Sequence, residues 1–391
     1  MRKNVKEVIT QRVRSVPPSG IRKFFDVLAT MEDVISLGIG EPDFATPQQI
    51  CHAGISSLER GETSYTSNAG MLELREELAS HLARLYGVQY DPVQELLMTV
   101  GVSEALHIAL LTVVEPGDEV IVPEPCFVSY KPGIIFAGGT PVVVEATVEN
   151  GFQVTAAQIE RVITPRTKAM LIGYPNNPTG AVMSRDRLME IASLAEKNDI
   201  LVLSDEIYDR LVYEVEHVCF SSLPNMRDRT ILLGGFSKSY AMTGWRLGYA
   251  AAPAEILSGM LKVHQYIIMC APTPAQVAGI EALRDGEDAL REMLHEYDQR
   301  RRVIVQGLNT IGMPCFEPHG AFYAFPSIQN TSLGSEVFSE KLLLEKKVAV
   351  VPGSAFGDSG EGFVRCSYAT SLVDIEEALG RMEELVREYR K

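Results

Sequence analysis

A lysine and an arginine eight residues apart are the side chains of this sequence that point most clearly to chemistry. Lys238 follows the apolar run 231–233, and Arg246 lies between two glycines next to Trp245, the single tryptophan of the chain. A lysine at the end of a buried strand is desolvated, which lowers its pKa and makes its amine a nucleophile toward a carbonyl. An arginine keeps its charge in such a place and suits a phosphate.

An amine for an aldehyde and a guanidinium for a phosphate together fit pyridoxal 5'-phosphate (PLP), and this cofactor is the hypothesis that the other residues must support. Each residue also has an ordinary interpretation. Most lysines are solvated surface groups, and Arg246 alone could be a salt-bridge residue. The position of Lys238 after a buried strand, between Ser237 and Ser239, favours the catalytic interpretation.

Three short apolar runs, 168–172, 200–203 and 230–233, predict neighbouring strands that are buried on both faces. The segment 184–198 between the first two has apolar residues at helical spacing behind Ser184, a residue type that commonly caps helices. Strand, helix and strand in this order are typical of an α/β protein with a mostly parallel sheet.

Polar residues follow each of these strands. Ligands of open α/β sheets bind at the carboxyl ends of the strands, so Asn177, Asp205, Tyr208 and Lys238 are expected to face one crevice. There Asp205 would pair with the protonated ring nitrogen of PLP, and Tyr208 and Asn177 would bond to its ring oxygen. Taken singly, Asp205 and Tyr208 would be interpreted as helix-capping and packing residues, and Asn177 as part of a turn.

A phosphate site is predicted where a helix begins after a strand. Gly101, Val102 and Ser103 would present backbone N–H groups at the positive end of the helix dipole, although many helices begin with such residues. Phe127 could stack on the cofactor ring, and Tyr65 could donate to the phosphate. Their ordinary interpretations are a core aromatic and a loop tyrosine.

Arg365 lies in an alternating, strand-like segment and could bind a substrate carboxylate through two parallel hydrogen bonds. A structural ion pair is the alternative. The segment 37–42 lacks the third glycine of a nucleotide-binding loop, so that interpretation is rejected. The histidines and cysteines are scattered, and no metal site or disulfide framework is predicted.

Length and charge limit the remaining possibilities. At 391 residues the chain is longer than a domain with a single hydrophobic core usually is. We therefore expect a small-domain segment over 1–45, a large domain over 46–285 and the rest of the small domain over 286–391. The net charge of −15 disfavours binding to nucleic acid or to anionic membrane. No apolar run has the length of a membrane span and the N-terminus lacks a signal-peptide core, which predicts a cytoplasmic protein.

As a set, these residues resemble the class I/II aminotransferases of PLP fold type I, most of all their bacterial and archaeal aspartate/aromatic/alanine branch. The resemblance extends over nearly the whole chain. It rests on the segments 19–24, 40–44, 65–70, 177–180, 204–208 and 237–246, together with Arg365. It implies an α/β fold in which a large domain has a mostly parallel sheet between helices, beside a smaller α+β domain.

The resemblance also implies a homodimer with active sites at the subunit interface and assigns the site residues. Lys238 would hold PLP as an internal aldimine and move the proton in the 1,3-shift, with Asp205 and Tyr208 as the other catalytic residues. Substrate would contact Gly40, Asn177 and Arg365. The cofactor would be held by Gly101, Val102, Ser103, Phe127, Asn177, Asp205, Tyr208, Ser237, Lys238, Arg246 and the partner subunit's Tyr65.

Two positions depart from the family pattern. Gly235 stands where a serine is common, so one phosphate hydroxyl is missing. Ser103 stands where similar aspartate aminotransferases often carry a lysine for the side-chain carboxylate. The apolar segment 265–270, expected near the pocket, also suits a neutral donor.

The sequence therefore predicts a ping-pong amino-acid:2-oxoacid aminotransferase that favours alanine, aromatic or other neutral donors, with 2-oxoglutarate as the expected acceptor. An aspartate aminotransferase is the alternative. A PLP-dependent β-lyase or decarboxylase and a non-catalytic regulator are further candidates.

Overall fold

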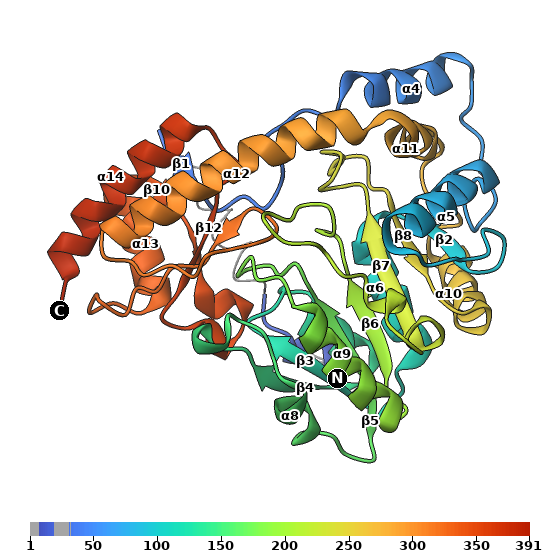
Figure 1. Ribbon diagram of the computed structural model, residues 1–391, viewed down its shortest axis with the longest axis horizontal. Helices are drawn as coiled ribbons and strands as arrows, with labels where there is room; N and C mark the ends of the chain where they lie inside the picture. Colours follow the sequence, from blue (N-terminus) through green and yellow to red (C-terminus); the bar gives the residue numbers. More distant parts are fainter. Residues whose placement is uncertain (1–7, 19–30, 32) are drawn as a thin grey trace, which may run out of the picture.

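A seven-stranded sheet forms the centre of the computed structural model, which describes residues 8–18, 31 and 33–391 (Figure 1). In spatial order the strands are β2 (Leu96–Thr99), β8 (Gly248–Ala251), β7 (Thr230–Gly235), β6 (Leu201–Asp205), β5 (Thr167–Gly173), β3 (Glu119–Glu124) and β4 (Thr140–Glu145). All neighbours pair in parallel except those of β8, which is antiparallel to β2 and β7. The predicted mostly parallel sheet is confirmed.

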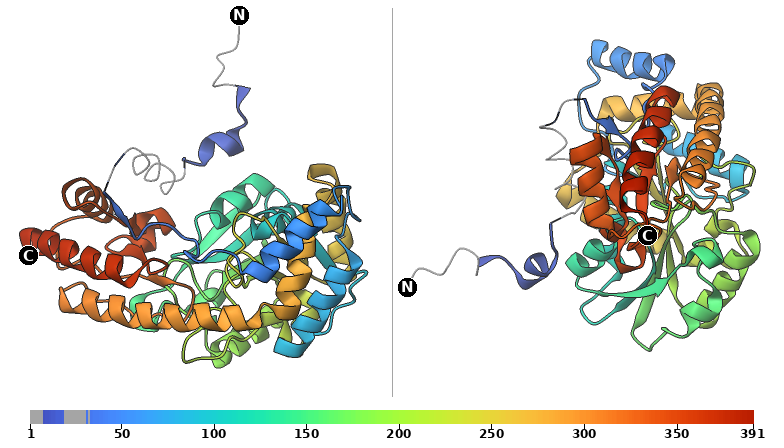
Figure 2. Two further views of the ribbon diagram at one scale, coloured as in Figure 1. Left: turned by 90° about the horizontal axis from the view of Figure 1, so that it is seen from above. Right: turned by 90° about the vertical axis from the view of Figure 1, so that its left-hand side faces the viewer.

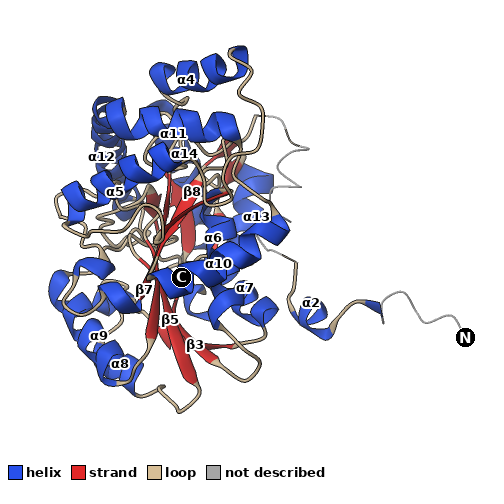
Figure 3. Ribbon diagram, turned by 90° about the vertical axis from the view of Figure 1, so that its right-hand side faces the viewer, coloured by secondary structure: helices blue, strands red, loops and turns tan. Residues whose placement is uncertain are grey.

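Helices cover both faces of this sheet, which is why its strands are apolar on both sides (Figure 3). Successive residues of β6 show the alternation. Val202 packs in one apolar cluster with Ile191 of α9 (Arg185–Lys197), and Leu203 packs in another with Ala105 of α6 (Gly101–Val113). The Ser184 side chain caps α9 by accepting from the Arg187 amide, as predicted.

The remaining helices of this part of the chain surround the sheet or pack at its β2 edge. They are α4 (Gln48–Glu59), α5 (Leu72–Tyr86), α7 (Tyr130–Ala137), α8 (Ala156–Glu160), α10 (Ala254–Ile267) and α11 (Thr273–Asp285). The short helix α2 (Gln11–Ser15) lies at the edge of the molecule, where Arg12 donates to the carbonyl of Phe136 at 3.0 Å (Figure 2). No helix among the described residues combines the length and the apolar character that crossing a membrane requires.

The C-terminal part has its own small sheet and core. β9 (Tyr323–Ala324), β11 (Val351–Pro352) and β12 (Val364–Ser367) form an antiparallel sheet, packed with α12 (Glu287–Thr310), α13 (Ser335–Lys346) and α14 (Leu372–Tyr389). The long helix α12 runs from this region toward α11 (Figure 1). The N-terminal strand β1 (Ile35–Ser36) pairs in parallel with β10 (Val348–Ala349). This pairing supports the proposed assignment of residues 1–45 to the small domain.

Individual elements follow the predictions closely. Arg365 lies on β12, as its alternating, strand-like segment predicts. The helix predicted to begin after a strand with Gly101, Val102 and Ser103 is α6, which follows β2 and begins at Gly101. The segment 19–24, one of the family-like motifs, lies outside the described residues.

The two-faced burial of the sheet predicts a difference between two identical substitutions. Val202→Ala removes two methyl groups from a fully buried site on β6 and is expected to lower the free energy of unfolding by about 2 kcal/mol. Val373→Ala on α14, where the valine is 71% exposed, is expected to change it by less than about 0.5 kcal/mol. Denaturant unfolding of the two variants measures both values, and equal losses would contradict the burial of Val202 between β6 and the helices that cover it.

Candidate functional site

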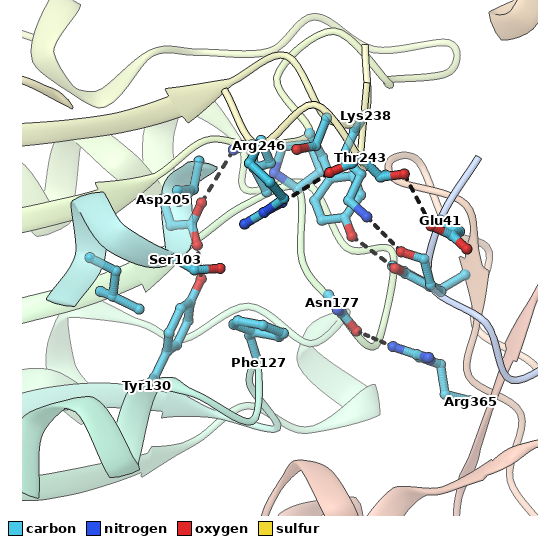
Figure 4. A pocket seen from close by; sticks show the side chains of 18 residues that line it. Glu41, Ser103, Phe127, Tyr130, Asn177, Asp205, Lys238, Thr243, Arg246 and Arg365 are labelled. Carbon is cyan, nitrogen blue, oxygen red and sulfur yellow. Dashed lines mark hydrogen bonds between the residues drawn. The ribbon is translucent and has the colours of Figure 1, made fainter. Parts of the chain in front are cut away.

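One pocket opens at the carboxyl ends of β5, β6 and β7 and brings together most of the predicted site residues (Figure 4). Asn177 follows β5, Asp205 ends β6 and Lys238 follows β7. The predicted residues that line this pocket are Gly40, Val102, Ser103, Phe127, Asn177, Asp205, Tyr208, Ser237, Lys238, Arg246 and Arg365. The crevice expected from strand order therefore exists.

The amine of Lys238 is desolvated in this pocket. Its Nζ donates to the carbonyl of Gly40 at 2.5 Å. Burial lowers the pKa of Lys238 to about 8, and the positive charges of Arg365 and Arg246 act in the same direction, while Glu41 opposes them. A larger share of this amine is neutral near pH 7 than of an exposed lysine, so it is better suited to attack a carbonyl.

The carboxyl group of Asp205 lies across the pocket from Glu41 and Arg365 (Figure 4). Its Oδ2 accepts from the hydroxyl of Tyr130 at 2.8 Å, and its Oδ1 accepts from the Ile207 amide at 3.3 Å. Burial raises the pKa of Asp205 to about 6, although both hydrogen bonds favour the carboxylate. A buried carboxylate of this kind is stabilised by a cationic partner such as a protonated ring nitrogen.

Two hydrogen-bonded pairs form the other side of the pocket. The hydroxyls of Tyr208 and Tyr323 lie 2.8 Å apart. Arg365 donates to Asn177 Oδ1 at 2.9 Å and to the carbonyl of Gly38 at 2.7 Å. The side-chain Nε of Arg365 is buried and has no partner among the described residues. A carboxylate is the group that would satisfy this guanidinium.

The start of α6 and Arg246 form a cradle for an anion. Arg246 donates only to carbonyl groups, of Thr243 at 3.1 Å and Val100 at 3.4 Å, and forms no ion pair within the described ranges. The backbone φ of Arg246 is +56°, which is rare for a residue other than glycine, and such strain is typical of functional positions. Its charge, the α6 amides and Ser237 suit a phosphate.

Two glycines allow this cradle to form. Gly101 has a φ of +74°, and a Cβ there would lie 2.5 Å from Nη2 of Arg246. A Cβ on Gly248 would lie 2.6 Å from the backbone of Gly101 and 2.7 Å from the Val102 amide nitrogen. The amine of Lys238 suits the aldehyde of PLP, the buried carboxyl of Asp205 suits its ring nitrogen, and Arg246, which has no ion pair among the described residues, suits its phosphate. The residues present therefore fit this cofactor.

Two residues and one segment that were predicted at the site do not line this pocket. Gly101 lies behind the lining and packs against Arg246. Tyr65 is 78% exposed and does not line the pocket. The segment 265–270 is expected near the pocket, but none of its residues lines it, and Tyr266 and Ile267 in the last turn of α10 are 85% and 53% exposed.

The structure leaves little room for a side chain at position 235, where the family commonly has a serine. A Cβ there would lie 3.1 Å from Cα of Gly248 and 3.2 Å from the carbonyl oxygen of Leu247, because β7 and β8 pack closely. A larger residue would therefore crowd the strand that supports the cradle.

Sequence reasoning missed several residues that complete the site. Tyr130 donates to Asp205, and its position three residues after Phe127 was the available signal, because that spacing brings two side chains to one side of a turn. Tyr323 comes from β9 and had no sequence signal. Thr243 donates to Glu41 at 3.0 Å at the pocket edge, and this pair was also not predicted.

The chain is similar to known proteins over nearly its whole length. The family model described as aminotransferase class I and II matches residues 32–382. The chain is 53% identical to a putative aminotransferase, YugH, of Bacillus subtilis, over 97% of this chain and 98% of that protein. It is 47% identical to an aspartate aminotransferase of Pyrococcus abyssi, over 98% and 99%. A solved aromatic aminotransferase from Pyrococcus horikoshii is 45% identical, with a TM-score of 0.90 over 93% and 99%.

The hydrogen bond from Tyr130 predicts how PLP binding depends on pH. Tyr130→Phe removes a bond that favours the Asp205 carboxylate, so the pKa of Asp205 rises further above about 6. Since the carboxylate is the form that pairs with a protonated ring nitrogen, PLP affinity is expected to fall by about tenfold at pH 6 and by much less at pH 8. Titration of cofactor-free protein with PLP at both pH values measures this, and an equal loss at both would contradict it.

Proposed function

The chain belongs to the family of class I and II aminotransferases, and from this we propose that it transfers the amino group of a neutral L-amino acid to a 2-oxoacid such as 2-oxoglutarate. Alanine and aromatic amino acids are the favoured donors, and the reaction belongs to amino-acid biosynthesis. The enzyme depends on PLP, as the family does. The observation that carries the proposal is the desolvated amine of Lys238 in one pocket with Asp205 and Arg246.

When bound, PLP supplies an aldehyde for the amine and a ring that withdraws electrons from the reacting carbon. Asp205 keeps the ring nitrogen protonated by holding a negative charge beside it. Tyr208 and Asn177 would orient the ring through its oxygen, and Phe127 would pack on its face. The amine of Lys238 would act as the base that removes a proton from the substrate and returns it one position away.

The charges that line the pocket support a neutral donor. The cations that line the pocket are Lys238, Arg246 and Arg365. In the proposal Lys238 reacts with the aldehyde, Arg246 binds the phosphate and Arg365 binds the substrate α-carboxylate. Ser103 offers no charge for a second carboxylate, and Glu41 would repel one. Aspartate remains the alternative donor because several relatives are named aspartate aminotransferases. The acceptor 2-oxoglutarate carries a second carboxylate as well, so pyruvate belongs in the same assays.

A homodimer and a cytoplasmic location complete the proposal. Tyr65 and the apolar residues Tyr266, Ile267 and Met269 are exposed in one protomer. Asn68 donates to the carbonyl of Met269 at 2.7 Å, which holds the two segments side by side. Such a patch supports a contact with a second copy, in which Tyr65 would reach the partner's phosphate site.

The catalytic amine gives the decisive test of the proposed reaction. Wild-type enzyme mixed with an amino donor alone is expected to convert bound PLP to its pyridoxamine form and to release the matching 2-oxoacid. Lys238→Ala is expected to lower kcat by at least about 10⁴-fold, because nucleophile and base are lost together. Absorbance spectra and oxoacid assays measure both. Release of pyruvate with ammonia would instead indicate a β-lyase, and undiminished turnover by the variant would overturn the assignment.

The exposed apolar patch predicts a dimer that one charge disrupts. Ile267→Glu is expected to convert a dimer to monomers and to weaken PLP binding, since Tyr65 would no longer reach the partner. Val373→Glu, at a position 71% exposed on α14, is the control and should stay dimeric. Sedimentation and PLP titration follow both effects. A wild-type protein that sediments as a monomer would refute the proposed assembly.

A further inference from the structure

A buried carboxylate lies directly beside Asp205 and has no part in the reaction described above. Glu206 is the next residue along the chain and is only 4% exposed. Successive side chains at the end of a strand point to opposite sides, so Glu206 points away from the pocket that Asp205 lines. It lies instead in a separate small hollow with Ser204 and His217.

The carboxylate of Glu206 is fully partnered there. Its Oε1 accepts from the hydroxyl of Ser204 at 2.8 Å and from the Phe220 amide at 2.9 Å. Its Oε2 lies 2.6 Å from Nε2 of His217, and both side chains are almost completely buried. Since water is excluded, these donors replace the solvation of the charge, and removal of one of them leaves the carboxylate uncompensated.

Asp209 is the second carboxylate on this side of the turn, and it is linked to His217 through Tyr86. Tyr86 donates to Oδ2 of Asp209 at 2.6 Å, and its ring packs edge-on against the ring of His217 with centroids 5.6 Å apart. Burial alone would lower the pKa of His217, but Glu206 and Asp209 raise it above its ordinary value. The other titratable groups that face these residues are Cys219, Tyr90, Tyr249 and Arg210.

The backbone of the turn carries the two sets of side chains to opposite sides. The Glu206 amide donates to the carbonyl of Leu233 on β7 at 2.9 Å, and the Asp209 amide donates to the carbonyl of Glu206 at 2.9 Å. Positions 205 and 208 therefore face the pocket, while positions 206 and 209 are held on its far side. A movement of Glu206 would move Asp205 with it, because the two share a peptide bond.

We propose that His217 is a positioning residue of the active site, which fixes Glu206 and through it holds Asp205 and Tyr208 toward the cofactor. This inference rests on the proposed roles of Asp205 and Tyr208. His217 contacts neither cofactor nor substrate in this arrangement, so its effect reaches the reaction only through the turn.

The test compares two amides at position 217. The Nε2 of a glutamine occupies the place of the histidine Nε2, whereas an asparagine amide stops near the histidine Nδ1 and does not reach Glu206. His217→Asn is expected to weaken PLP binding and lower kcat/KM by about 10- to 100-fold each, the range for loss of a bond to a buried charge. It should also displace the pH titration of the bound cofactor's absorbance. His217→Gln is expected to restore all three readouts to within about threefold.

Two further variants separate stability from positioning. Ile191→Ala removes a fully buried side chain of α9 in the same apolar cluster as Phe220 and should lower stability while leaving the absorbance titration unchanged. Tyr86→Phe removes only the donation to Asp209 and should shift the titration in the direction of His217→Asn but less. It keeps the test decisive if His217→Asn does not fold.

Asp205→Asn distinguishes failure of the inference from failure of the proposed function. If Asp205→Asn leaves PLP affinity and the titration unchanged, the proposed role of Asp205 itself is wrong. If Asp205→Asn changes both, the positioning role of His217 is overturned by either of two results. The first is that His217→Asn, or Tyr86→Phe if His217→Asn does not fold, lowers stability and leaves the absorbance titration unchanged, as Ile191→Ala does. The second is that His217→Gln restores neither PLP binding, nor kcat/KM, nor the titration.

Discussion

Burial of an amine and a carboxyl group in one pocket, without pairing them with each other, is the constraint on which the rest of the structure depends. Lys238 donates to a carbonyl, and Asp205 accepts from a hydroxyl and an amide, so neither charge neutralises the other. Burial shifts the pKa of each group toward its neutral form, to about 8 for the lysine and about 6 for the aspartate. Both groups are thereby kept ready for an external partner.

The parallel sheet makes this burial possible. Its strands are apolar on both faces and covered by helices, and the polar residues of the pocket gather at the carboxyl edge, where the strands end. The strand β8 departs from the parallel order, and its Gly248 lets the start of α6 approach closely enough to form the anion cradle with Arg246.

The N-terminal segment closes the pocket from the opposite side. Thr46 donates to the carbonyl of Ala241 at 2.7 Å, and Trp245 Nε1 donates to Thr46 at 3.0 Å. Asp43 accepts two hydrogen bonds of 2.8 Å from the buried Arg300 of α12. These contacts hold the segment with Gly40 between the Lys238 loop and the long helix α12.

The strands that precede Asn177, Asp205 and Lys238, and their meeting at one edge, could be predicted from the sequence, because periodicity and composition record how a segment is buried. The residue types that could hold PLP were predictable as well. The hydrogen-bond partners of those residues were not, because they come from other elements of the fold. Tyr323 meets Tyr208 across 115 positions of sequence, and Glu41 meets Thr243 across 202. Such contacts depend on how separate elements pack, and packing between distant segments leaves no periodic pattern in either of them.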